Sequence, residues 1–174
     1  MPKPRSRPDR GAIAIGLTAS LLYSLFVLTM YLDGHAPTRP GALIPQTDPY
    51  LWQALFTLPW LFLTLLVFAS LTHGLAARHA TSRPFRQTLS SCALAFASPL
   101  LLAFLIPETI TYALAGHEAL STAIRFTGPI TLLLWLVLTY RMLRRLHDLS
   151  WRRALWTAPA ALIPALLFMS LVIR

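Results

Sequence analysis

Five apolar stretches alternate with short polar segments along this chain. Each stretch holds about 20 mostly apolar residues. At a rise of about 1.5 Å per residue, that is enough to cross a hydrocarbon core about 30 Å thick. The pattern therefore predicts five transmembrane helices, at residues 12–32, 51–71, 88–106, 123–143 and 153–173.

The composition supports a membrane protein. Hydrophobic residues make up 56% of the chain and charged residues 12%, and the mean hydropathy is +0.60. This leaves too little polar surface to cover a soluble globule. We expect an all-α, polytopic helical bundle, in which a basic cytoplasmic segment, 1–11, precedes a single five-helix domain, 12–174. The first apolar stretch is longer than the core of a signal peptide, about 7 to 15 residues, so we expect it to be retained.

The basic residues indicate the orientation. The formal net charge is +9, but the basic residues lie at the ends of apolar stretches and do not form one exposed stripe, so we expect no nucleic-acid partner. Lys and Arg in short loops resist translocation. If the N-terminus is cytoplasmic, all but three of the 15 basic residues lie on the inner side, the exceptions being Arg39, Arg125 and Arg174. We expect the N-terminus inside and the C-terminus outside a bacterial cell (inner) membrane.

Small residues recur every four positions along the first stretch, at Ala12, Gly16, Ser20 and Ser24. This spacing places them on one face of a helix, and small faces let transmembrane helices approach closely. The pattern predicts a packing surface. The sequence leaves open whether its partner is another helix of this chain or another subunit.

Prolines occur inside the four later stretches, at Pro59, Pro99, Pro129, Pro159 and Pro164. Each one removes a backbone hydrogen bond and favours a kink. Transporters build substrate sites from such broken helices. A small transporter or permease component with a site at these helices is therefore an alternative function, and it predicts a polar cavity at mid-membrane depth.

Few polar side chains are candidates for a catalytic, metal or cofactor site. We expect no ionisable residue buried at mid-depth, and an ion pair between Glu108 and Arg125 near the outer interface is possible from their positions. Among the histidines, His73 and His147 are the one pair placed to meet. Cys92 is the single cysteine, and no metal-protease, nucleophile-elbow, phosphate-loop or paired-carboxylate motif occurs. We expect no catalytic residue, no metal and no cofactor.

Several segments resemble one family. They are His73-Gly-Leu-Ala-Ala-Arg78, Phe85-Arg-Gln-Thr-Leu89, Ala97-Ser-Pro99, Ile106-Pro-Glu-Thr-Ile110 and Arg144-Arg-Leu-His-Asp-Leu-Ser-Trp-Arg-Arg-Ala154. Together they resemble the bacterial Yip1-domain membrane proteins over most of the chain from Leu51 onward. The resemblance implies a multi-pass protein with five spans and a cytoplasmic N-terminus. Eukaryotic members act in vesicle trafficking through small GTPases, a role that we do not transfer to this chain.

Arginines crowd the short segment between the last two stretches, at Arg141, Arg144, Arg145, Arg152 and Arg153. Each cation near an anionic leaflet contributes about 1 kcal/mol to membrane binding. These arginines enforce topology, and they are candidates for contact with lipid headgroups or partner proteins. The sequence thus favours a non-enzymatic membrane scaffold, or an accessory subunit of a larger membrane complex, whose partners are lipids and other membrane proteins.

Overall fold

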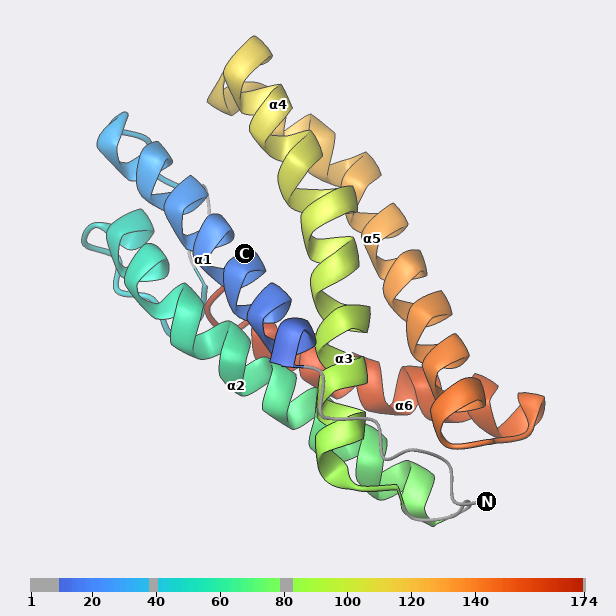
Figure 1. Cartoon of the computed structure of the whole chain (residues 1–174). Helices are drawn as coiled ribbons and strands as arrows, with labels where there is room; N and C mark the ends of the chain where they lie inside the picture. Colours follow the sequence, from blue (N-terminus) through green and yellow to red (C-terminus); the bar gives the residue numbers. More distant parts are fainter. Residues whose placement is uncertain (1–9, 38–40, 79–82, 174) are drawn as a thin grey trace.

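The chain forms a bundle of helices in the computed structural model, which describes residues 10–37, 41–78 and 83–173 (Figure 1). In chain order the helices are α1 (Arg10–Leu32), α2 (Pro49–Ala77), α3 (Phe85–Pro99), the π-helix η1 (Leu100–Leu105), α4 (Ile106–Ala115), α5 (His117–Leu146) and α6 (Trp151–Met169). These ranges contain no strand. The predicted all-α fold is confirmed. Residues 1–9 of the predicted basic segment, 1–11, lie outside the described residues.

Four helical segments are long and apolar enough to cross a membrane, namely Gly11–Leu32, Pro49–Ala77, Phe85–Ala115 and His117–Leu146. They coincide with the first four predicted spans. The third joins α3, η1 and α4 without a break. Large apolar side chains cover the exterior of the bundle, as expected where lipid replaces water. The most exposed include Leu32, Leu102, Leu114, Phe126, Trp156 and Leu167. The chain is a multi-pass helical bundle.

Helix α6 occupies the fifth predicted span but is not among those four segments. Arg152 and Arg153 lie in its first turn, and Pro159 and Pro164 lie inside it, so no span-length stretch of this 19-residue helix is as apolar as those within the four segments. Figure 1 shows α6 crossing behind α3 at a steep angle to α5. Mid-way along α2, the indole Nε1 of Trp60 donates to the carbonyl of Phe168, at 3.0 Å.

The segment after α6 meets the loop between α1 and α2. The backbone N–H of Leu43 donates to the carbonyl of Leu171 at 2.9 Å. A Cβ built on Gly41 would lie 2.6 Å from the carbonyl oxygen of Val172, closer than side chains tolerate. The close approach of these two backbones therefore requires glycine at position 41.

Two antiparallel pairs make up most of the bundle, namely α1 with α2 and the segment α3–η1–α4 with α5 (Figure 1). Helix α1 packs against α2 and α3, while α5 packs against α3, η1 and α4, and α6 lies against α2 and α5. Gly116 alone separates α4 from α5, and its φ of 78° lies in the left-handed region that glycine adopts without strain. Figure 1 shows the resulting hairpin of α4 and α5.

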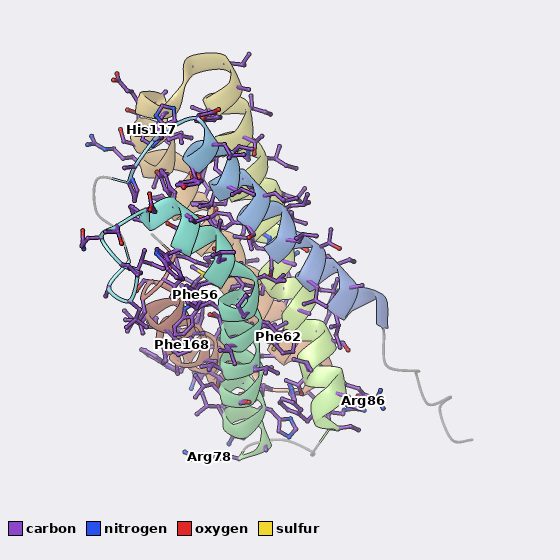
Figure 2. All side chains as sticks on the ribbon, turned by 90° about the vertical axis from the view of Figure 1, so that its left-hand side faces the viewer. Phe56, Phe62, Arg78, Arg86, His117 and Phe168 are labelled. Carbon is purple, nitrogen blue, oxygen red and sulfur yellow. The ribbon has the colours of Figure 1, made fainter. Side chains whose placement is uncertain are left out.

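The two ends of the bundle differ in charge. Figure 2 shows Arg78 and Arg86 at one end and His117 at the other. The turn between α5 and α6 lies with the first group, because Arg83 forms a salt bridge with Asp148 of that turn at 3.2 Å. We call this the basic end and the opposite one the His117 end.

Candidate functional site

A buried polar cluster joins three helices at the basic end. The hydroxyl of Thr88 on α3 lies 3.2 Å from Nδ1 of His73 on α2 and 3.3 Å from Nε2 of His147, which follows α5. Thr88 and His147 are buried, at 0% and 2% exposure, and His73 is half-buried. The sequence singled out this histidine pair, and the structure brings the two rings to 6.3 Å between centroids.

The chemistry open to this cluster is limited. A histidine beside a hydroxyl is the pairing that activates nucleophiles, but Thr88 is fully buried, and a substrate cannot reach its oxygen. No group of three or more metal-binding side chains occurs in the described ranges. The arrangement is suited to fixing the ends of α2, α3 and α5 relative to one another.

His147 lies outside the four spans, and its surroundings lower its pKa. Burial is the main cause, because it disfavours the charged imidazolium, and His73 and Arg83 add to the effect, while Asp148 opposes it. Protonation of this imidazole therefore disfavours the folded basic end.

The five arginines singled out from the sequence are all exposed around the α5–α6 turn. Arg152 stacks over the ring of Trp151, with 5.2 Å from its guanidinium carbon to the ring centroid. Arg141 and Arg145 differ from the others because they line a groove of about 460 Å³ between α3 and α5.

The stripe of small residues on α1 lies against α2 and α3 of the same chain. Ala12 and Ser20 are buried, and a Cβ on Gly16 would lie 3.6 Å from the Cβ of Ala93 on α3. Ser24 donates a hydrogen bond to the carbonyl of Ala54 on α2. In the structure, then, the partners of the stripe lie within the chain.

Glu108 is buried inside the bundle, at 3% exposure. It lies two residues beyond the predicted third span, 88–106, and within the helical segment Phe85–Ala115. The hydroxyl of Thr127 on α5 donates to Oε1 of Glu108 at 3.3 Å. Glu108 and Arg125 do not form an ion pair. Arg125 is exposed, and it is only two positions from Thr127, so it projects from a different face of α5.

A π-helix precedes Glu108. In η1 (Leu100–Leu105) each turn holds about one residue more than in an α-helix, and Leu100, Ala103 and Leu105 are buried. Glu108 lies in the first turn of α4, which follows directly. Single turns of π-helix of this kind occur frequently at functional sites.

A second histidine pair, which the sequence did not indicate, lies at the His117 end. The rings of His35 and His117 stack with centroids 4.4 Å apart. Nε2 of His117 lies 3.0 Å from the hydroxyl of Tyr50, and Tyr112 donates to Asp33. The residues come from separate loops and helix ends, so no spacing in the sequence could reveal this cluster.

A cavity lies at mid-depth near Pro99 and Pro129, where the transport alternative requires a polar one. Its volume is about 90 Å³, below the roughly 150 Å³ that accommodates benzene in an engineered apolar cavity. Its lining is mostly aromatic and aliphatic: Tyr23, Leu61, Leu100, Phe104, Gly128, Thr131, Trp135, Met169 and Ile173. The cavity is therefore small, and most of its lining is apolar.

Comparisons of this chain with family models, with curated proteins and with solved structures found no match.

Proposed function

We propose that this chain is a non-enzymatic integral membrane scaffold or accessory subunit, Yip1-like in plan, with five spans, a cytoplasmic N-terminus and an outer C-terminus in the inner membrane. The observation that carries the proposal is the small apolar cavity at mid-depth, because a transporter needs polar contacts and room for its solute there. The buried Thr88 supports it, since the polar cluster at the basic end is closed to substrates.

The proposed partners are lipids and other membrane proteins. Five exposed arginines at one end match an anionic leaflet, and they also favour the cytoplasmic side for that end. The small-residue face of α1 is occupied by α2 and α3. A partner subunit would therefore dock on another face, among the large apolar side chains of the exterior.

The orientation is tested by cysteine labelling. Replacing the buried Cys92 by Ser removes the single cysteine, and Thr47→Cys or Ser150→Cys then introduces one exposed thiol at either end of the bundle. In intact spheroplasts, an impermeant thiol reagent should label position 47 and should reach position 150 only after permeabilisation. A reporter fused to the C-terminus should be active on the outer side. Labelling of position 150 in intact cells would overturn the orientation.

The scaffold role is tested by purification in mild detergent. A stoichiometric membrane partner should copurify and should be lost when a bulky charged residue, as in Leu133→Lys, is placed on the exposed face of α5. The conservative Leu133→Ile is the control. A protein that purifies alone and moves solutes across liposome membranes would reject the proposal.

Buried Glu108 keeps the small transporter as a second candidate function. Ionisable residues within membrane spans are costly and usually functional. If this candidate is correct, Glu108→Gln should abolish solute or proton movement in liposomes while leaving the fold intact, because the amide oxygen still accepts from Thr127. Under the scaffold proposal, the same variant behaves like the wild type.

A further inference from the structure

A shallow groove lies on the side of the bundle at the basic end. It runs between α3 and α5 and has a volume of about 460 Å³. Its lining residues are Ser91, Leu94, Ala95, Ser98, Leu138, Arg141, Met142, Arg145 and Leu146. Arg145 is one residue from the end of α5, and Leu138 lies seven residues, or about 10 Å, farther into the span. The groove thus extends from the membrane surface into the hydrocarbon region.

The charge in the groove is concentrated at one place. Arg141 and Arg145 are four residues apart on α5, so their side chains project from the same face of the helix. No carboxylate is among the lining residues, and the nearby Asp148 is bound to Arg83. Two guanidinium groups side by side suit the oxygens of one phosphate, which arginine binds through paired N–H donors.

The remaining wall suits an acyl chain. Leu94 on α3 and Leu138 on α5 both line the groove, and Leu94 is 38% exposed. The hydroxyl of Ser98 donates to the carbonyl of Leu94 at 2.8 Å, so its hydrogen bond is made within its own helix. The part of the groove farther from the arginines therefore offers chiefly apolar contact.

We propose that this groove binds one anionic phospholipid of the cytoplasmic leaflet, with its phosphate on Arg141 and Arg145 and one acyl chain along Leu94 and Leu138. The groove opens on the side of the bundle at membrane depth, where lipid is the molecule at hand and a water-soluble phosphate compound has no access to the apolar wall. Placement in the cytoplasmic leaflet rests on the proposed function, which sets the orientation.

The test uses the full chain in detergent micelles, titrated with dioleoyl phosphatidylglycerol or dioleoyl phosphatidylcholine and observed by native mass spectrometry. The two lipids share their acyl chains and differ in net charge. We expect phosphatidylglycerol to bind preferentially. If each arginine contributes about fivefold, Arg141→Gln with Arg145→Gln should weaken phosphatidylglycerol binding about 25-fold. The matched control, Arg144→Gln with Arg152→Gln, removes the same charge from exposed positions outside the groove.

Two further arms separate the phosphate from the acyl chain. Leu94→Trp should fill the apolar wall and weaken the binding of phosphatidylglycerol at unchanged charge, whereas Leu132→Trp, on an exposed part of α5 outside the groove, should not. Soluble glycerol 3-phosphate should compete poorly. Effective competition by that compound would show a free-phosphate site and overturn the lipid assignment.

Equal losses in the two arginine pairs, or equal binding of the two lipids by the wild type, would also overturn the proposal. A micelle has no inner or outer leaflet, so these results do not depend on the orientation of the chain. Failure of the proposed function would appear in the cysteine labelling and copurification experiments and would leave the lipid-binding result unchanged.

Discussion

Replacing Gly16 by leucine should destabilise the protein, because the space beyond its α-carbon is already occupied. A Cβ at this position would lie 3.6 Å from the Cβ of Ala93 and 3.8 Å from Cδ2 of Leu65, which are ordinary contact distances. Each further carbon extends about 1.5 Å beyond Cβ, so a leucine has to push α1 away from α3 or α2. Overpacking of this kind costs about 1–3 kcal/mol.

Two variants make the test specific to packing. Gly16→Ala adds only the Cβ that the site accommodates, so its stability should equal or exceed that of the wild type. A Cβ added to Gly74, on α2, would meet no atom within 4 Å, so Gly74→Leu should change stability by less than about 0.5 kcal/mol. Unfolding is followed by circular dichroism while the fraction of denaturing detergent in mixed micelles is raised. Equal stability of the two leucine variants would refute the packing argument.

Three further predictions concern other contacts. Gly41→Ala should cost about 1–3 kcal/mol in the same assay, because the new Cβ meets the backbone carbonyl of Val172, and unchanged stability would contradict that close approach. The pKa of His147 is lowered in the folded state, so the unfolded state binds more protons, and stability should fall as the pH decreases below about 6.5. His147→Gln should reduce this pH dependence. An unchanged slope of stability between pH 7.5 and pH 5 in that variant would contradict the role of His147. Thr127→Val removes the hydroxyl that bonds Glu108 and should cost about 0.6–1.7 kcal/mol, as hydrogen bonds between membrane helices do, whereas no loss would show that the carboxyl group has another partner.

The elements themselves were predictable because each follows from a local property. A run of about 20 apolar residues must satisfy its backbone groups internally in lipid, and a helix does so within the segment. The first four predicted spans accordingly coincide with α1, α2, the continuous segment α3–η1–α4, and α5. The arginine spacing on α5 was also visible, since residues four apart share a face whatever the tertiary fold.

The candidate sites were less predictable because they depend on how helices are rotated and where their ends meet. Thr88 was not singled out, although it bridges the two histidines that were. The stacking of His35 on His117 brings together residues 82 positions apart by sequence number. A hydrophobic pattern reports which residues lie in the membrane, but it does not report which of them face one another.

By itself, the sequence determined that this protein is a bundle of apolar helices with a cluster of basic residues at one end, because hydropathy and charge act residue by residue. The tertiary structure decided that Glu108 lies inside, that the mid-depth cavity is small and apolar, and that Arg141 and Arg145 line a groove while Arg144 does not. The physical reason is that these features depend on how each helix is rotated about its own axis and on the angle at which neighbouring helices meet, and no local preference in the chain records either.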